Sequence, residues 1–238
     1  MQQLKFLNEQ GDFILHGAQD PAGIYFPLVN ESGMMSSVTP LLSGDCKTGQ
    51  STFLLAPAGA ETLHESRASR NFWVQINDGT PWSAAGQSAP QQALRFAEGT
   101  EEAVLTGGLL WQKVSRRHTA SGLYSELLSF VPAGRENIEI MQVTLVNGGT
   151  AALRLVPTAA IPVYGRSADS IRDHRHVTSL LHRVELRPHG LDVTPAMIFD
   201  ERGHRPGQVT YRIWGGDETG MPPAGFIPLV QDFVGRGS

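Results

Sequence analysis

The chain has 238 residues, of which 40% are hydrophobic and 18% are charged, and its formal net charge is −4 at pH 7. This composition excludes an intrinsically disordered chain. It gives no reason to expect a nucleic acid or an acidic membrane as a partner, because both are bound through a basic face. The 26 glycines and 15 prolines indicate many turns, which favours β structure over a helical bundle.

Cysteine content and the N-terminal segment bear on the cellular compartment. Cys46 is the only cysteine, so no disulfide can form within the chain. Residues 1–13 lack the basic segment and the apolar run of a signal peptide. No apolar stretch approaches the roughly 18 residues that span a bilayer. We therefore expect a cytoplasmic protein without a membrane partner.

The first half of the chain indicates short strands separated by turns. The predicted strands are residues 4–8, 12–17, 23–30, 51–57 and 71–78. The first two are expected to form a hairpin around Glu9-Gln10-Gly11. Pro27 indicates an edge or irregular strand, since proline has no amide proton to donate. Residues 59–69 are a weaker helical candidate.

The second half continues this pattern. Its predicted strands are three within residues 101–134, followed by 137–147, 152–161, 176–187, 191–199 and 208–216. Turns between neighbouring strands are predicted at Gly107-Gly108, Ser121-Gly122 and His189-Gly190. Alternating apolar and polar residues from 138 to 146 lead into Asn147-Gly148, which predicts a hairpin with the strand that follows.

A short helix is predicted from Ser167 to Arg175. Ser167 can cap it, Asp169 lies in its first turn, and Arg172 and Arg175 lie in its last turn, which suits the helix dipole. Regularly spaced strands with few helices predict an all-β fold: a two-sheet antiparallel β-sandwich with one or two short helical insertions. Because the sequence has no linker, charge block or internal repeat, residues 1–238 are predicted to form a single domain.

The segment 164–183, "YGRSADSIRDHRHVTSLLHR", holds four arginines, two aspartates and three histidines. Two interpretations remain open: a solvated helix with local Arg–Asp pairs, or a contact strip for a sugar or for another protein surface. The apolar flanks favour the contact strip, because polar groups set inside a sheet need partners. The residues expected to bind substrate or to contact another domain are Arg166, Asp169, Arg172, Asp173, His174, Arg175 and His176.

Other chemistry is not expected from this segment. The histidines lack metal-site spacing and a cysteine partner, and the arginines between them would repel a cation, so no metal is predicted. No G-x-S-x-G motif indicates a nucleophilic serine. Asp169 and Asp173 each lie within three residues of an arginine, which would keep them ionised, whereas a general acid needs an apolar environment.

Two further sets of residues have competing interpretations. Residues 199–207, "FDERGHRPG", predict a charged hairpin loop more readily than a functional site. An aromatic set is more often core in a β-sandwich than a platform for stacking sugars. Its members are Phe72, Trp73, Trp82, Trp111 and Trp214.

Several strings are similar to the N-terminal region of bacterial β-1,2-oligoglucan phosphorylases. These enzymes belong to glycoside hydrolase family 94, formerly glycosyltransferase family 36. The strings are "YFPLVNESGMMSSVTPLLSGD", "SRASRNFWV", "FVPAGRENIEIMQVTLVN", "AAIPVYGRSADSIRDHRHVTSLLHR" and "FDERGH". The resemblance covers essentially the whole chain, and the segment 164–183 is its most specific part.

The resemblance implies a galactose-mutarotase-like supersandwich that precedes a helical linker and a catalytic (α/α)6 barrel. The barrel carries the general-acid aspartate, and inorganic phosphate is the nucleophile that inverts the anomeric centre. It also implies a β-linked gluco-oligosaccharide as ligand, no cofactor, and a homodimer in which this domain lies near the partner's active site. No residue of this chain matches the catalytic aspartate or the phosphate-binding residues, so the chain alone is expected to be inactive.

Three hypotheses follow for the function. The first is a non-catalytic sandwich domain of a β-glucan phosphorylase that supports oligosaccharide binding and dimer assembly. The second is a free-standing carbohydrate-binding module. The third is a mutarotase-like epimerase that uses His174 and His176 together with an acid.

Overall fold

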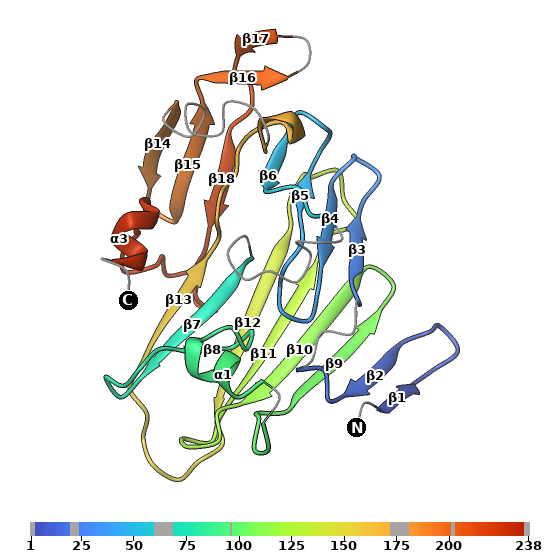
Figure 1. Ribbon diagram of the computed structural model, residues 1–238, viewed down its shortest axis with the longest axis vertical. Helices are drawn as coiled ribbons and strands as arrows, with labels where there is room; N and C mark the ends of the chain where they lie inside the picture. Colours follow the sequence, from blue (N-terminus) through green and yellow to red (C-terminus); the bar gives the residue numbers. More distant parts are fainter. Residues whose placement is uncertain are drawn as a thin grey trace. The chain divides into compact units, whose positions relative to one another are not determined.

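The protein is all-β, with several antiparallel sheets and short helices, and the predicted fold class is thereby confirmed (Figure 1). The computed structural model describes residues 3–19, 24–59, 69–95, 97–171, 181–200 and 203–235. The chain divides into two compact units. Unit 1 comprises Met1–Gly49 and Pro57–Pro162, and unit 2 comprises Gln50–Ala56 and Val163–Ser238. The single-domain organisation stays a prediction.

The largest sheet of unit 1 has six antiparallel strands. In spatial order they are β1 (Gln3–Phe6), β2 (Phe13–His16), β9 (Ala103–Gly108), β10 (Trp111–Arg117), β11 (Leu123–Phe130) and β12 (Ile140–Asn147). In β11 every second residue is buried, as expected for a strand with one face on the core. The hairpin predicted around Glu9-Gln10-Gly11 is confirmed as β1–β2.

The turn between β9 and β10 differs in detail from the prediction. Leu109 and Leu110 make the turn, and Leu110 has a φ of 64°. Gly107 and Gly108 instead end β9. A Cβ atom on Gly107 would lie 2.8 Å from the Phe26 ring, so close packing requires glycine there.

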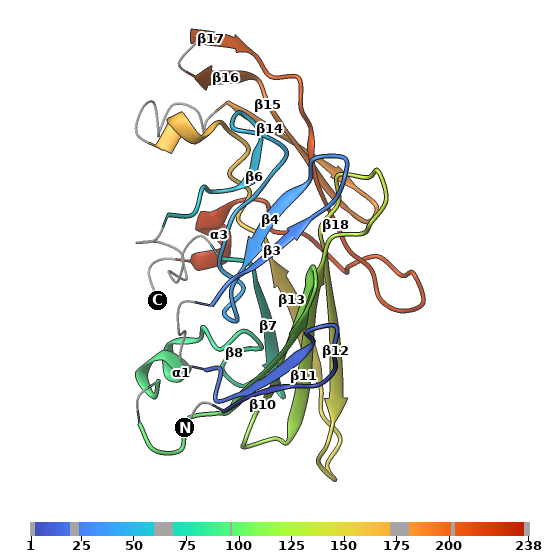
Figure 2. The ribbon, with the colours of Figure 1, turned by 90° about the vertical axis from the view of Figure 1, so that its right-hand side faces the viewer.

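Two smaller antiparallel sheets complete unit 1. In the first, the strand order is β13 (Leu155–Ala160), β7 (Asn71–Ile76) and β8 (Trp82–Ser83). In the second, neighbouring strands follow the chain order β3 (Phe26–Val29), β4 (Met35–Val38) and β5 (Cys46–Lys47). The prediction of an edge strand at Pro27 is confirmed, because β3 pairs with β4 alone. In Figure 2, β7 and β8 run beside β10 and β11, and the Trp82 and His118 rings lie 5.6 Å apart.

The hairpin predicted at Asn147-Gly148 is wrong, because β12 pairs with β11 and the next strand, β13, pairs with β7. The Asn147 side chain closes a local loop by bonding the Gly149 amide at 3.0 Å and the Ala151 carbonyl at 2.8 Å. The Arg154 amide then donates to the Asn77 side chain at 2.8 Å and docks the chain onto the end of β7. The chain thus crosses to a second sheet.

Unit 2 contains one three-stranded sheet and a separate hairpin. The sheet has the order β14 (His182–Arg187), β15 (Gly190–Pro195) and β18 (Tyr211–Trp214), and β16 (Met197–Asp200) pairs with β17 (Gly203–Pro206). The hairpins predicted around His189-Gly190 and within 199–207 are therefore confirmed. β6 (Phe53–Leu55) bridges to Arg166.

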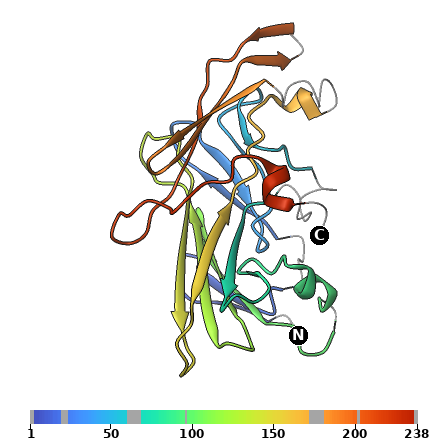
Figure 3. The same cartoon turned by 90° about the vertical axis from the view of Figure 1, so that its left-hand side faces the viewer.

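The helices are short. Ala168–Ile171, the described part of the predicted helix, is a 3-10 helix, η2, which lies beside β16 (Figure 3). The other helical candidate lies mostly outside the described residues. Sequence reasoning missed α1 (Ala89–Ala93), although Ser88 and Gln91 form a capping box, and α3 (Val230–Val234). Among the described helices, none has the length and hydrophobicity needed to cross a bilayer.

Candidate functional site

The structure describes two of the seven predicted contact residues. Arg166 is half-buried in unit 2, and Asp169 is exposed in the first turn of η2. The remaining five lie outside the described residues: Arg172, Asp173, His174, Arg175 and His176. The proposed roles of all seven stay predictions.

Arg166 is held by contacts within unit 2. Its guanidinium lies 4.4 Å from the centroid of the Tyr164 ring, and its Nε donates to the Tyr164 carbonyl at 3.1 Å. Its own carbonyl accepts from the Phe53 amide at 3.0 Å. These contacts fix the backbone at the beginning of the predicted strip.

The end of the strip packs against its beginning. A Cβ atom on Gly165, which has a φ of +60°, would lie 3.2 Å from Cε1 of the His182 ring. Burial lowers the pKa of His182, and the nearby charge of Arg166 lowers it further. The imidazole is therefore expected to stay neutral at pH 7, so it does not add a positive charge to the strip.

One face of the β14–β15–β18 sheet carries polar and aromatic side chains. The pairing register aligns Glu185 with Asp192 and Asp192 with Arg212 across the three strands. Because side chains alternate along a strand, the residues two positions away share this face. We call it the Trp214 face; it consists of Glu185, Arg187, Gly190, Asp192, Arg212 and Trp214.

Asp192 is the centre of the charge network on the Trp214 face. It accepts a bidentate pair of hydrogen bonds from Arg212, at 2.7 and 3.0 Å, and another from Arg187 Nε at 3.0 Å. Arg187 also donates to Glu185 at 2.6 Å. The hydrogen bonds from Arg212, and next the one from Arg187, lower the pKa of Asp192 to about 2. Both guanidinium groups are thus held on the sheet by a carboxylate that is ionised at neutral pH.

Trp214 projects from this network with 58% of its surface exposed. The Arg212 guanidinium lies 4.7 Å from its ring centroid, and the His189 ring lies 6.4 Å away. A Cβ atom on Gly190 would lie 1.8 Å from the Ile213 carbonyl oxygen and 2.8 Å from Trp214 Cδ1, so the close approach of β18 requires glycine there. An exposed indole beside fixed hydrogen-bonding groups can stack on a sugar ring while those groups bind its hydroxyls.

The other aromatic residues of the predicted set are less exposed. Trp82 is buried, and Phe72, Trp73 and Trp111 are half-buried. Trp82 is therefore a core residue, as the sequence indicated, whereas Trp214 is the member of this set with more than half of its surface exposed. The sequence analysis included Trp214 in the aromatic set but did not identify Arg187, Asp192 and Arg212 as its neighbours. These residues come together only through the pairing register of β14, β15 and β18.

Unit 1 contains a cavity of about 260 Å³ that sequence reasoning missed. Trp82, Glu101, Arg116 and His118 contribute polar groups or rings to its wall. Trp82 Nε1 donates to Glu101 at 2.8 Å, and Gln91 Nε2 donates to the same carboxylate oxygen at 2.8 Å. These residues come from separate elements between positions 82 and 118, so no local motif indicates the cavity.

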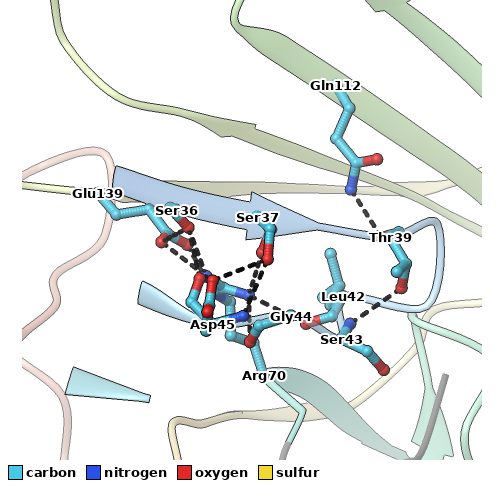
Figure 4. A network of polar contacts seen from close by, with 10 residues as sticks. All are labelled: Ser36, Ser37, Thr39, Leu42, Ser43, Gly44, Asp45, Arg70, Gln112 and Glu139. Carbon is cyan, nitrogen blue, oxygen red and sulfur yellow. Dashed lines mark hydrogen bonds and ion pairs between the residues drawn. The ribbon is translucent and has the colours of Figure 1, made fainter. Parts of the chain in front are cut away.

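Figure 4 shows a second polar cluster of unit 1, which surrounds Arg70. Arg70, which is 2% exposed, pairs with Glu139 at 2.5 Å and donates to the Ser36 hydroxyl at 2.7 Å. Its guanidinium also donates to the backbone carbonyls of Ser37, Leu42, Gly44 and Asp45. Because these bonds use the donors of the guanidinium, the cluster holds the β4–β5 connection in place and leaves no donor of Arg70 free for a ligand.

Comparison with known proteins adds no relative: no protein-family model matches this sequence, and no curated protein matches it. The Trp214 face is accordingly the candidate site for a sugar ligand on grounds of geometry. Its arginine and aspartate side chains are of the kind that the sequence predicted for the strip, whereas the exposed indole was not predicted there.

Proposed function

We propose that this chain is a non-catalytic β-sandwich domain of an inverting β-glucan phosphorylase of the β-1,2-oligoglucan or cellobiose type, in glycoside hydrolase family 94. In this proposal it supports oligosaccharide binding and homodimer assembly in the cytoplasm. The five sequence strings and the antiparallel all-β fold support the proposal. The general acid belongs to an (α/α)6 barrel outside these residues, inorganic phosphate is the co-substrate there, and no cofactor takes part.

The Trp214 face is the observation that carries the sugar-binding part of the proposal. In a β-linked glucan each glucose ring has an apolar face of C–H groups and a rim of hydroxyls. The indole of Trp214 can stack on the apolar face, which removes water from both surfaces. Arg187 and Arg212 can donate to the hydroxyls without losing orientational freedom, because Asp192 already holds them.

The predicted strip and the Trp214 face are joined in the chain. The strip ends at Arg183, the second residue of β14, and the same strand carries Glu185 and Arg187 of the Trp214 face. In the proposal, residues 166–176 extend this contact surface toward the oligosaccharide or toward the catalytic barrel. This role rests on the resemblance and on the mixed arginine, aspartate and histidine content.

Calorimetric titration with β-1,2-linked gluco-oligosaccharides tests the sugar-binding part. We expect measurable binding by the wild type and a loss of about tenfold or more in affinity for Trp214→Ala, because an aromatic contact contributes about 0.5–1.5 kcal/mol beyond its buried area. Tyr25→Ala removes an exposed aromatic residue of unit 1 and serves as the matched control. Equal affinities of wild type and Trp214→Ala would reject the Trp214 face as the site.

A phosphorolysis assay tests the non-catalytic part. The 238 residues, incubated with the same oligosaccharides and inorganic phosphate, are expected to release no glucose 1-phosphate. Release by this chain alone would contradict the assignment of the chemistry to a barrel elsewhere. Light scattering of the same sample measures whether the chain forms the expected homodimer.

The alternative function is a free-standing carbohydrate-binding module, and the exposed indole of Trp214 favours it too. The two functions differ in their need for the barrel. A phosphorylase domain should form a stable complex with an (α/α)6 barrel of a β-1,2-oligoglucan phosphorylase added in trans, whereas a module should remain separate. Size-exclusion chromatography of the mixture distinguishes them.

A further inference from the structure

The unit 1 cavity contains a buried arginine. Arg116 lies on the core side of β10, two and four residues beyond the buried Val114 and Gln112, and is 4% exposed. Its guanidinium belongs to the cavity wall. Among the hydrogen bonds and ion pairs of the described residues none involves this guanidinium, and its Nε is buried without a partner.

The Glu101 carboxylate acts on Arg116 through its charge but forms no ion pair with it. Glu101 lines the same cavity, but Trp82 and Gln91 both bond its Oε2 at 2.8 Å and restrain it. Burial lowers the pKa of Arg116 to about 10, and the charge of Glu101 opposes this shift. The guanidinium is therefore still positively charged at neutral pH, with no ion-pair partner among the described carboxylates.

The backbone at Gly86 leaves space for the Arg116 guanidinium. Gly86, which also lines the cavity, has a φ of +80°, and a Cβ atom there would lie 2.5 Å from Arg116 Cζ. Any other residue at this position would displace the guanidinium. The chain thus holds a buried positive charge at the wall of an open cavity.

An unpaired charge in the protein interior is energetically unfavourable, and an anionic partner offsets this cost. The planar fork of arginine matches the two oxygens of a carboxylate or a phosphate group. The volume of about 260 Å³ lies below the range of about 300–1,000 Å³ typical of drug-sized ligands, so the ligand must be small. We infer that this cavity binds a small oxyanion, a carboxylate or phosphate group carried by a molecule of about one sugar ring or less, with Arg116 as its counter-charge.

Thermal unfolding in phosphate, acetate or chloride at matched ionic strength tests the inference. Phosphate and acetate are expected to raise the midpoint of unit 1 unfolding in a concentration-dependent way, by roughly 5–10 °C at a hundredfold excess over Kd, whereas chloride should not. Arg116→Gln should remove this stabilisation, and Arg117→Gln, which changes the exposed neighbour on β10, should keep it. Arg116→Gln is expected to fold, because it removes a buried charge that no described residue pairs.

A measurement on the wild type alone keeps the inference testable should Arg116→Gln fail to fold. Addition of phosphate should shift the proton resonances of Arg116 Nε–H and of Trp82 Nε1–H, which lie in the cavity wall. Equal effects of phosphate and chloride, or unchanged resonances, would overturn the inference. Two sugar-borne oxyanions then identify the source of the anion: glucose 6-phosphate is compared with phosphate, and glucuronate is compared with acetate. Tighter binding of the sugar derivative identifies a sugar-borne ligand, and weaker binding identifies the free anion.

Discussion

Arg70 and Arg116 are both almost completely buried in unit 1, but their surroundings differ. Arg70 has a carboxylate, a hydroxyl and four carbonyls as partners, whereas Arg116 has a cavity. A buried charge with a full set of bonds stabilises one arrangement of the chain. A buried charge without such bonds is energetically unfavourable unless a ligand supplies the partner. Arginine therefore has a structural role at position 70 and a proposed binding role at position 116.

Arg70→Met should destabilise unit 1 by about 3–5 kcal/mol, because it leaves the Glu139 carboxylate buried without its partner. Arg154→Ala, which breaks the ion pair with Asp78 at a position where Arg154 is 67% exposed, should cost no more than about 1 kcal/mol. Urea unfolding of both variants measures the difference. Similar losses would show that the buried network contributes no more than a surface pair.

Asp192 gives the Trp214 face a defined pH dependence. Since the Arg212 and Arg187 hydrogen bonds lower its folded pKa to about 2, from an ordinary value of 3.8, the carboxylate stabilises the fold at pH values above about 4. This contribution is lost as the pH falls from about 4 to 2. The stability difference between wild type and Asp192→Asn should therefore be present at pH 7 and shrink across that interval. A difference that does not vary between pH 7 and pH 2 would contradict the ion network.

At the scale of elements, alternation of apolar and polar residues predicted the strands well. β11 has the period-2 burial pattern that a half-buried strand requires, and the sequences of β14 and β15 alternate apolar and polar residues. The pairing of β13 was mispredicted because Asn147-Gly148 gives a strong local hairpin signal, whereas the docking of Arg154 on Asn77 is a long-range contact. α1 was missed although its capping box is visible in the sequence, since five residues give no helical periodicity.

The β4–β5 connection offers a test of close backbone packing. Gly44 has a φ of +126°, and a Cβ atom there would lie 2.1 Å from the Ser37 carbonyl oxygen. Gly33 has a φ of +95° with open space around it. Both alanine variants bear the cost of a left-handed backbone, about 1–2 kcal/mol, but Gly44→Ala should lose about 1–3 kcal/mol more because of the overlap. Equal losses in chemical unfolding would mean that the connection moves aside freely.

At the scale of the whole molecule, sequence reasoning found the fold class but only part of the candidate site. It placed the contact residues in one contiguous string, of which the structure describes Arg166 and Asp169. The Trp214 face depends on the register of three strands, and the cavity is lined by residues that lie between Gln19 and His118 in the sequence. Neither arrangement has a local motif, because each is created by pairing and packing between separate segments.

The two sites belong to different units and are proposed to bind ligands of different charge. Binding at one should therefore survive the loss of the other. We expect Arg116→Gln to bind neutral gluco-oligosaccharides like the wild type, and Trp214→Ala to retain the response to phosphate. Calorimetry and thermal unfolding on the two variants check this independence; loss of both activities in either variant would contradict it.

The central claim is that the Trp214 face recognises a β-linked gluco-oligosaccharide, and mapping the ligand by nuclear magnetic resonance tests it most directly. Titration of the isotope-labelled chain with a β-1,2-linked gluco-oligosaccharide should shift the indole Nε1–H resonance of Trp214 and the Nε–H resonances of Arg187 and Arg212, with those of unit 1 unchanged. Unchanged resonances on this face at millimolar oligosaccharide, or shifts confined to other residues, would contradict the claim.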